Sequence, residues 1–510
     1  MYSNLYSASL LGIDAFIVEI EIHLDKALPA INIVGLPDSA VKESRDRVSA
    51  AVKNSGFPFP SKKVTVNLAP ADVKKEGSAF DLPIALGILS SIGIIDNDLT
   101  NEFVSLGELS LEGKLRPVHG ALSIAIEARN KGFKKVLLPA DNANEAALVS
   151  DIDIIPVESL EQAVNYINGD DDIEPLKVDL DKVFNTDDVL NTINMSDVRG
   201  QENVKRALEV SAAGGHNILM IGPPGSGKTM LAKRIPTILP PISVEESLET
   251  TKIHSIAGLL EQKESLVNIR PFRSPHHTIS DAALVGGGMN FIKPGEISLA
   301  HHGVLFLDEL PEFKRNVLEV LRQPIEEKKI SISRTKMTVE YPANFMLVCS
   351  MNPTPDGQNP DESSSSPAQI QRYLGRVSGP LLDRIDIHIE VPPVNYSELS
   401  SKRAGEDSKK IRDRVLNARQ KQLDRFNGNG EVFKNADMST KQIRKHCILD
   451  EASQQLLKMA MNKLGLSARA YDRILKVART IADLEGKESI ASEHISEAIQ
   501  YRSLDREYWE

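Results

Sequence analysis

A glycine-rich octapeptide, GPPGSGKT at residues 222–229, follows a strand-like apolar run and opens a helix-like segment. The pattern G-x-x-x-x-G-K-[ST] in a strand–turn–helix setting is typical of a loop that wraps phosphate groups. Its glycines let successive backbone N–H groups face phosphate oxygens at the start of a helix. The octapeptide therefore predicts a nucleotide site within a parallel α/β sheet. The residues expected to bind the nucleotide are Gly222, Pro223, Pro224, Gly225, Ser226, Gly227, Lys228 and Thr229.

Two side chains of this loop and two acids downstream predict the chemistry. Lys228 can bring a mobile positive charge to the β- and γ-phosphates, and the Thr229 hydroxyl can ligate Mg²⁺. The run GVLFLDEL at residues 303–310 is typical of a strand buried on both faces, and ligands bind at the carboxyl ends of such strands. We therefore expect Asp308 to hold Mg²⁺, directly or through water, and Glu309 to deprotonate an attacking water. The predicted cofactors are ATP and Mg²⁺.

Three further polar residues follow in an order that suits the same chemistry. A third strand-like run, NFMLVCSMNP, ends at Asn352, whose amide can bond a γ-phosphate without adding negative charge. Arg384 and Arg469 could brace charge on a transferring phosphoryl group. Taken singly, the asparagine also fits an ordinary Asn-Pro turn, and each arginine also fits a surface ion pair.

At 510 residues the chain is too long for one compact core, so several domains are expected. Residues 1–168 alternate short β-rich and helical runs, and residues 169–195 form an acidic stretch without apolar periodicity, which predicts a linker. A second α/β block covers residues 196–393, and helical periodicity dominates residues 394–510. The predicted fold class is α/β, multidomain.

Composition excludes some classes of protein. The net charge of −11 argues against a protein that coats nucleic acid over its whole surface. It does not exclude a local basic channel. Cys349 and Cys447 are far apart and read as reduced core thiols of a cytoplasmic protein. The longest apolar run, from Ile84 to Ile95, is too short to cross a bilayer and predicts a buried helix.

With the loop, acid pair, asparagine and arginines in this order, the chain resembles an AAA+ ATPase of the magnesium-chelatase-like group. Longer segments resemble the ComM/YifB family across nearly the whole chain, among them RPFRSPHHTISDAALVGGG, RYLGRVSGPLLDRIDIHIEVP and VGLPDSAVKESRDRVSAAVKNSGF. The resemblance implies a Lon-protease-like (ribosomal S5 domain 2-like) α+β N-terminal domain, an AAA+ core and a C-terminal helical lid.

The resemblance also implies roles and partners. Arg384 would be an arginine finger for the neighbouring subunit's nucleotide, and Arg469 a sensor that couples the lid to the phosphates. A finger acting in trans implies a homo-hexameric ring. The family resemblance further implies a DNA helicase that drives branch migration during natural transformation and homologous recombination, with recombination proteins as candidate partners.

A basic hairpin offers support for DNA that is independent of the resemblance. Residues 328–341, KKISISRTKMTVEY, alternate like a β-hairpin, which we expect to carry its basic residues near the tip. Six such hairpins would line a channel with positive charge, although a solvated basic hairpin fits the pattern equally well. The residues concerned are Lys328, Lys329, Arg334 and Lys336.

The chain departs from its relatives at two places. In Lon-type proteases, which the N-terminal domain resembles, a serine attacks the substrate and a lysine acts as its base. Ser78 matches the serine, but Leu122 occupies the position of the lysine, so no protease activity is expected. The resemblance implies that many family members carry four cysteines for zinc after the Asn352 strand. This chain has Thr354, Asp356, Ser363 and Ser365 near those positions, and threonine and serine are poor zinc ligands, so no zinc is expected.

Two alternatives stay open on the sequence. A magnesium-chelatase motor subunit would share the ATPase block, and a protein remodeller would use the N-terminal domain to recruit polypeptides. The Lon-like domain argues against the first alternative, and the basic hairpin argues mildly against the second.

Overall fold

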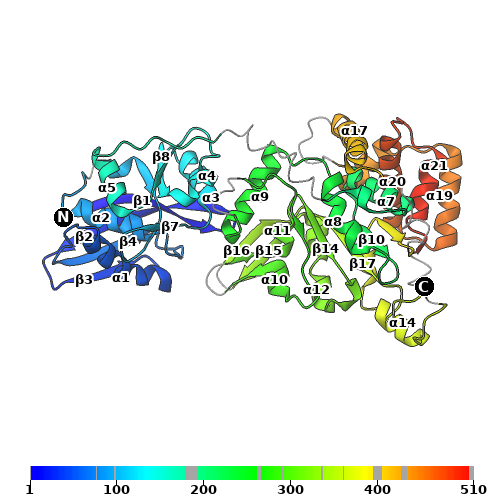
Figure 1. Ribbon diagram of the computed structural model, residues 1–510, viewed down its shortest axis with the longest axis horizontal. Helices are drawn as coiled ribbons and strands as arrows, with labels where there is room; N and C mark the ends of the chain where they lie inside the picture. The colour runs from blue at the N-terminus through cyan, green and yellow to red at the C-terminus, as the bar shows by residue number, and fades with distance from the viewer. Residues whose placement is uncertain are drawn as a thin grey trace.

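The structure is a computed structural model. It describes residues 2–75, 77–96, 99–178, 193–260, 266–288, 292–334, 337–359, 361–393, 405–426 and 434–504, without the side chains of residues 101, 334 and 337. Figure 1 shows an elongated chain in which the N-terminal sheet lies at one end, the phosphate-loop sheet in the middle and the C-terminal helices at the other end.

The N-terminal part is built on a seven-stranded mixed sheet. In sheet order its strands are β3 (Ala30–Val34), β4 (Lys63–Ala69), β2 (Asp14–Asp25), β1 (Tyr2–Leu11), β5 (Phe103–Ser105), β8 (Lys135–Pro139) and β9 (Asp153–Val157). Alternate residues of β4 are buried, as expected of a strand with one face on a core. The accompanying helices are α1 (Ser39–Asn54), α2 (Asp81–Ser91), α3 (Ala121–Asn130), α4 (Ala140–Ala146) and α5 (Leu160–Asn168).

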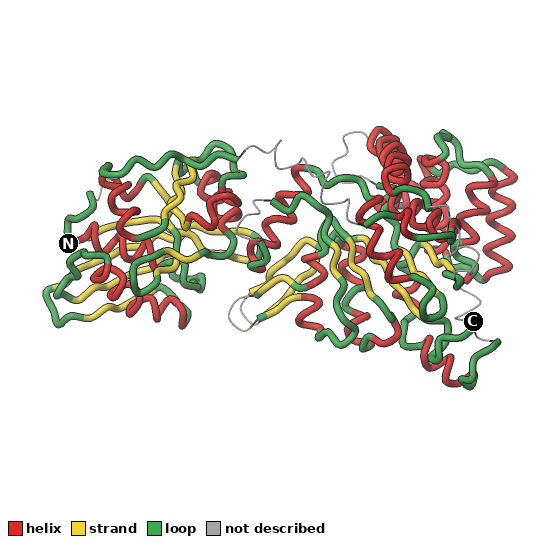
Figure 2. The backbone as a smooth tube through the Cα atoms, in the orientation of Figure 1, coloured by secondary structure: helices red, strands yellow, loops and turns green. Residues whose placement is uncertain are grey.

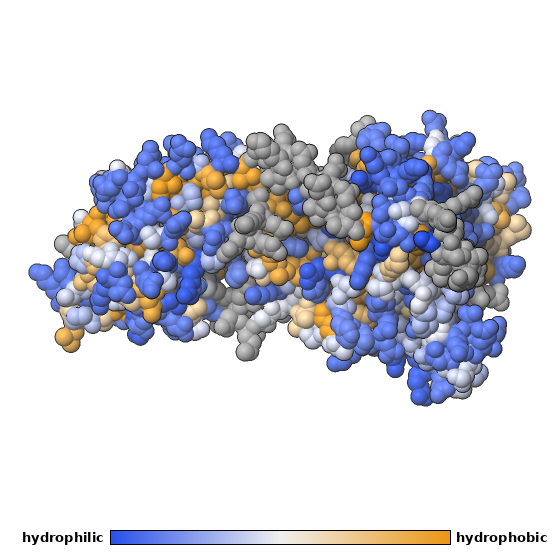
Figure 3. All heavy atoms as spheres, viewed as in Figure 1, coloured by the Kyte–Doolittle hydropathy of each residue, from blue (hydrophilic) through white to orange (hydrophobic). Residues whose placement is uncertain are grey.

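Helix α2 carries the first part of the apolar run predicted to be a buried helix, and every residue from Asp81 to Ser91 is buried, but the helix ends there and Gly93 is exposed. The expectation of a core helix is thus confirmed as far as Ser91. Among the described residues, none of the helices combines the length and apolarity needed to span a bilayer. Hydrophilic side chains predominate over the C-terminal helices on the face seen in Figure 3.

The middle part contains a five-stranded parallel sheet. Its strands, in sheet order, are β11 (Phe272–Arg273), β14 (Val304–Leu307), β17 (Met346–Met351), β10 (Ile218–Ile221) and β18 (Ile387–Glu390). The four residues of β10 and of β14 are all buried, as expected for strands covered on both faces. Because the strands are parallel, all their carboxyl ends lie at one end of the sheet, which we call the carboxyl edge. All their amino ends lie at the opposite end, which we call the amino edge.

Helices and two hairpins surround this sheet. The helices are α7 (Glu202–Gly214), α8 (Lys228–Ile238), α9 (Val244–Ala257), α10 (Asp281–Val285), α11 (Glu296–Leu299), α12 (Arg315–Glu319), α13 (Arg322–Glu327), α14 (Pro367–Leu374) and α15 (Gly379–Leu382). One hairpin pairs β12 (Gly286–Gly287) with β13 (Lys293–Pro294), and the other pairs β15 (Lys329–Arg334) with β16 (Met337–Pro342). Tyr341 of β16 donates its hydroxyl to the carbonyl of Ile292 over 2.5 Å, which ties the two hairpins together.

The C-terminal part is helical, as predicted, and Figure 2 shows it without strands in the described region. Its helices are α17 (Ser408–Phe426), α18 (Thr440–His446), α19 (Glu451–Leu464), α20 (Ala468–Leu484) and α21 (Ser492–Gln500). Their apolar faces join the core of the middle sheet in one continuous cluster that includes Ile218, Val348 and Ile481. The helical part therefore packs directly on the sheet that carries the phosphate loop.

The N-terminal part contacts both α9 and the β15–β16 hairpin. The backbone N–H of Gly120 donates to Ser255 Oγ over 3.0 Å. At the β1–β2 turn a Cβ on Gly12 would lie 2.6 Å from Val339 Cγ1, so the close approach to β16 requires glycine. In the stretch predicted as a linker, Leu176 donates to Ile154 of β9 over 2.9 Å, and residues 179–192 lie outside the described region.

Candidate nucleotide-binding and hydrolysis site

The phosphate loop joins β10 to α8 at the carboxyl edge, as the octapeptide predicted. Gly227 has φ 91°, a left-handed conformation that favours glycine. A Cβ on Gly222 would lie 2.2 Å from the carbonyl oxygen of Val391, so only glycine fits between β10 and β18. Gln201 donates to the carbonyls of Ser226 and Pro392 over 2.8 and 2.9 Å and thereby fixes the loop.

Lys228 is the first residue of α8, and its side chain folds back onto the phosphate loop. Its Nζ donates to the carbonyls of Gly222 and Pro223 over 2.6 and 2.9 Å and to Asn352 Oδ1 over 3.2 Å. Burial lowers the pKa of Lys228, while Asp308 and Glu309 act in the opposite direction. Because all three hydrogen-bond partners of Nζ are neutral, none of them neutralises the ammonium, and its charge is available to a phosphate group. The same contact places Asn352 beside the loop, as predicted.

The two predicted Mg²⁺ ligands meet at the carboxyl edge. Thr229 Oγ1 donates to Asp308 Oδ2 over 2.8 Å. A hydroxyl and a carboxylate are the hard oxygen ligands that Mg²⁺ prefers, so this pair fits the ion. Sequence reasoning missed Ser350, whose hydroxyl donates to the second oxygen of Asp308. Ser350 is a polar residue near the end of the otherwise apolar β17, and that break in the pattern is the signal that could have found it.

Glu309 follows Asp308 in a left-handed conformation, with φ 54°. A non-glycine residue in this region is strained, and such strain concentrates at functional sites. Its carboxylate Oε2 lies 3.5 Å from His277 Nδ1. The His277 ring is held between His276, at a centroid distance of 4.1 Å, and Phe313, at 6.4 Å. Sequence reasoning missed His277, although His276 and His277 closely follow β11, the strand beside β14.

Arg384 is not near the phosphate loop of its own chain. Its carbonyl accepts from Asn217 Nδ2 over 3.1 Å, and Asn217 immediately precedes β10. Arg384 therefore lies at the amino edge, and β10, at about 3.3 Å per residue, separates it from the loop by roughly 13 Å. Its guanidinium pairs with Glu326 of α13 over 2.8 Å.

Arg469 lies on the same side as Arg384. It is exposed near the start of α20, one helical turn before Arg473. Arg473 donates to the carbonyl of Arg384 over 3.0 Å and pairs with Asp386. Because residues four apart share a helix face, Arg469 also projects near the amino edge. The structure thus brings the loop, Asp308, Glu309 and Asn352 together and places both arginines elsewhere.

Comparison with known proteins decides the family. The competence protein ComM of Haemophilus influenzae is 46% identical over 506 residues, which cover 98% of this chain and 97% of that protein. The protein YifB of Escherichia coli is 44% identical over 508 residues, covering 99% of this chain and 97% of its own length. The chain belongs to the ComM/YifB family. The resemblance identified from the sequence is therefore confirmed.

Matches to broader families place the ComM/YifB chain among magnesium-chelatase-like AAA+ proteins. Residues 194–399 match the family described as magnesium chelatase, subunit ChlI, and residues 405–502 match the C-terminal part of that subunit. Residues 20–142 match a family described as subunit ChlI of Mg-chelatase. A ChlI homologue of Methanocaldococcus jannaschii is 22% identical over 59% of this chain and 81% of its own length. Membership in this group implies the use of ATP and Mg²⁺.

The basic hairpin differs from its prediction. Strands β15 and β16 pair Lys329 with Pro342 and Arg334 with Met337, so the turn lies beyond Arg334. The expectation that Lys328 and Lys329 lie near the tip is wrong, because α13 ends at Glu327 and both lysines stand at the base. Lys329 donates to Glu340 over 3.0 Å.

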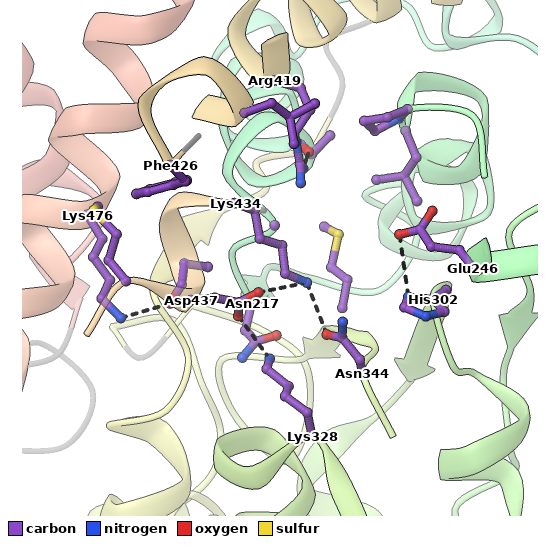
Figure 4. Close-up of a pocket in the computed structure, with 18 of the residues that line it drawn as sticks. Asn217, Glu246, His302, Lys328, Asn344, Arg419, Phe426, Lys434, Asp437 and Lys476 are labelled. Atoms are coloured by element: carbon purple, nitrogen blue, oxygen red, sulfur yellow. Dashed lines mark hydrogen bonds and ion pairs between the residues drawn. The ribbon is translucent and has the colours of Figure 1, made fainter. Parts of the chain in front are cut away.

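The other three basic residues of the hairpin have different positions. Lys328 lies 3.4 Å from Asp437 of the C-terminal part (Figure 4). Arg334 ends β15 beside the turn, as expected. Lys336 lies outside the described residues.

The loop of residues 354–365, for which the sequence predicts no zinc, is organised around one carboxylate. Asp356 accepts the hydroxyls of Thr354, Ser363 and Ser364 over 2.6, 2.8 and 2.8 Å. These hydrogen bonds, that of Thr354 first, hold the pKa of Asp356 well below its usual range. A Cβ on the next residue, Gly357, would lie 2.6 Å from Pro224, so the loop packs against the phosphate loop.

At the position matched to the Lon serine, Ser78 donates its hydroxyl to Glu108. Leu122, at the position of the lysine base, is fully buried on α3. A hydroxyl becomes a good nucleophile only when a base takes its proton. Leucine cannot take that proton, so the lysine base of the Lon-like comparison is missing, and the acceptor that faces the Ser78 hydroxyl is the Glu108 carboxylate.

Both cysteines are buried free thiols, Cys349 in β17 and Cys447 among the C-terminal helices. Burial raises the pKa of Cys447 to about 12, so it stays a thiol at neutral pH.

Proposed function

We propose that this chain is a Mg²⁺-dependent ATPase that works as a homo-hexameric ring motor on DNA. The observation that carries the proposal is the division of the ATPase residues between two edges of one sheet. Lys228 and Asp308 lie at the carboxyl edge, whereas Arg384 lies at the amino edge. Arg384 of one copy can therefore serve only the nucleotide of another, and head-to-tail contacts of this kind close into rings.

Each residue at the carboxyl edge has a distinct task in ATP hydrolysis. Backbone N–H groups within residues 225–229 and the Lys228 ammonium hold the phosphates. Thr229 and Asp308 hold Mg²⁺, which neutralises charge developing on the phosphates when bound. Glu309 takes the proton of the attacking water. Asn352, already hydrogen-bonded to Lys228, directs its amide to the γ-phosphate.

The amino edge of the neighbouring copy completes the reaction. Its Arg384 braces the charge that spreads over the transferring phosphoryl group. Its Arg469, exposed one turn before Arg473, reaches the same nucleotide from the helical lid and reports its state. Release of the Arg384–Glu326 pair frees the finger when two copies meet.

DNA is the proposed substrate of the motor. The relative from Haemophilus influenzae is named a competence protein, which supports a role in natural transformation. Arg334 stands beside the turn of the β15–β16 hairpin, where a ring would present it to a strand in the central channel. We propose helicase activity that promotes branch migration on single-stranded or branched DNA during homologous recombination, in the cytoplasm and with recombination proteins as partners.

ATPase rates and strand displacement measured with single-stranded, forked and four-way DNA test this proposal. We expect stimulation of ATP hydrolysis by DNA and displacement of one strand. Stimulation by unfolded protein and not by DNA would instead support a protein remodeller. Stimulation only by a porphyrin with Mg²⁺ would support a chelatase subunit.

For the N-terminal part we propose a Lon-like fold without proteolysis. Incubation with casein and ATP should release no peptides. Peptide release that Ser78→Ala abolishes would contradict this.

A further inference from the structure

A cavity of about 1700 Å³ opens at the amino edge, between the middle sheet and the C-terminal helices. Figure 4 shows side chains entering it from both sides. Asn217 and Asn344 come from the starts of β10 and β17, and Lys434 and Lys476 come from the C-terminal part. The cavity is remote from the phosphate loop, because it lies at the other end of the strands.

The inner wall of the cavity carries four cations and one carboxylate. Lys328 and Lys434 lie 3.4 and 3.8 Å from the two oxygens of Asp437. Lys476 donates to the carbonyl of Ala436 over 2.8 Å. Arg419 donates to the carbonyl of Ala212 over 3.0 Å, and its buried Nε has no hydrogen-bond partner. Asp437 can balance only one of these charges.

Three of the other described carboxylates that line the cavity are paired with arginines. The pairs are Glu246 with Arg270, Glu326 with Arg384 and Asp386 with Arg473. Glu245 bonds to the hydroxyl of Ser243 and Glu249 to the ring of His302, so no described arginine or lysine balances either of them, but Lys441 and Lys445 also line the cavity. Among the described lining residues, positive charge therefore remains in excess.

Unbalanced buried charge is unfavourable, and two of these groups show its effect. Lys434 is only 15% exposed, and burial lowers its pKa to about 8, with Lys328 and Arg419 adding repulsion. Burial likewise lowers the pKa of Arg419 to about 10. A bound anion would restore the hydrogen bonds and the charge balance that burial removes.

We propose that this cavity binds a small anion carrying several phosphate groups, held by Lys434, Arg419, Lys476 and Lys328. The cavity volume exceeds what one phosphate needs, and four cations match a chain of phosphates better than a single carboxylate. Asn217 and Asn344 supply neutral donors at the floor. Because Lys328 immediately precedes β15, the bound anion would connect the hairpin that we propose to face DNA to the C-terminal helices.

Binding can be measured on the full chain carrying Lys228→Ala, so that the phosphate loop does not contribute. Calorimetry at constant ionic strength with inorganic tripolyphosphate should give saturable binding of one anion per chain. Adding Lys434→Met should weaken it about tenfold or more, since a charge-assisted hydrogen bond is lost. Lys458→Met, on the exposed surface of α19 and outside the cavity, should leave binding unchanged.

The same titration with orthophosphate and with ATP distinguishes the sources of the phosphate groups. Tighter binding of ATP than of tripolyphosphate would identify a nucleoside triphosphate, whereas equal binding would identify the phosphate chain alone. Absence of saturable binding by all three anions would overturn the proposal.

A second variant tests the charge imbalance without any ligand. Asn344 Oδ1 lies 3.2 Å from Lys434 Nζ, so Asn344→Asp places a carboxylate where the anion is expected, with almost no change of shape. We expect a higher melting temperature without anion and at least tenfold weaker tripolyphosphate binding. A lower melting temperature combined with unchanged binding would show that the cavity has no excess positive charge.

Discussion

The two edges of the five-stranded sheet are built in different ways. At the carboxyl edge, Lys228, Thr229, Asp308 and Asn352 bond to one another or to the loop over 2.6–3.2 Å, so one chain completes this half of the site. At the amino edge, Arg384 and Arg473 bond to carboxylates of their own chain around a large basic cavity. The first edge has its residues already in contact, whereas the second leaves Arg384 without a phosphate loop of its own chain. If the function proposed above is right, this contrast means that the active unit is larger than one chain.

Removal of the amino-edge arginine should have the largest effect. We expect Arg384→Ala to lower ATP turnover by about 10³-fold or more. The reason is that Arg384 of one copy is proposed to stabilise the phosphoryl group that is transferred in the site of the neighbouring copy. ATP binding, followed with a fluorescent analogue, should persist. Arg45→Ala, an exposed arginine paired with Asp46, serves as the control.

Mixing subunits sharpens the same comparison. An Arg384→Ala copy keeps an intact carboxyl edge, and a Lys228→Ala copy keeps an intact amino edge, so the mixture should partly recover turnover. Failure to recover any activity, with assembly intact, would mean that the arginine does not act across the interface.

The proposed catalytic base, Glu309, gives the next effect. Glu309→Gln should lower turnover by about 10² to 10⁴-fold, because the amide cannot accept a proton from water. ATP binding and assembly should be unaffected, since Lys228 and Asp308 remain. Single-turnover hydrolysis measures this, and near-normal rates would place the base elsewhere.

His277 should contribute less. Because its Nδ1 lies 3.5 Å from Glu309 Oε2, we expect His277→Ala to lower kcat by about tenfold, equivalent to about 1.4 kcal/mol, with KM for ATP unchanged. His23→Ala is the control, since that exposed histidine pairs with Asp25 in the N-terminal part. An equal loss in both variants would indicate a general packing defect.

The last effect concerns the stability of the fold at the amino edge and leaves turnover at neutral pH unchanged. Burial lowers the pKa of His301 to about 4, although Glu249 acts in the opposite direction. The unfolded chain takes up this proton near pH 6.5, so between pH 6.5 and 4 it binds more protons than the folded chain. The contribution of His301 to the free energy of unfolding is complete above pH 6.5. It decreases as the pH falls toward 4, by at most about 3 kcal/mol.

Urea unfolding of the wild type and His301→Gln at pH 7 and pH 4.5 measures that contribution. The variant should lose less stability on acidification. Equal losses would assign the acid sensitivity to other groups. The backbone N–H of Asn344 donates to His301 Nδ1 over 3.0 Å, so in the neutral ring Nε2 carries the proton that faces Glu249. That proton makes the neighbouring Glu249, His301 and His302 a poor metal site.

The sequence alone determined the carboxyl edge. Lys228 and Thr229 belong to one continuous loop, and Asp308 and Asn352 follow apolar strands, so strand ends in a parallel sheet brought them together. The polar break at Ser350 in the apolar run of β17 marked that residue in the sequence, but its bond to Asp308 depends on which strands are neighbours, as does the position of His277 beside Glu309. Nor could it show that Lys328 stands at the base of the hairpin.

Only the tertiary structure decided the amino edge. Lys328, Asn344, Arg419 and Lys434 come from separate segments and meet because the C-terminal helices pack on the sheet. Periodicity predicts that a helix is amphipathic but not which surface it covers, since many surfaces can bury the same apolar face. The side of the sheet near which Arg469 lies follows from that packing and was beyond the reach of local pattern, whereas Arg384 lies at the amino edge because it shortly precedes the parallel strand β18.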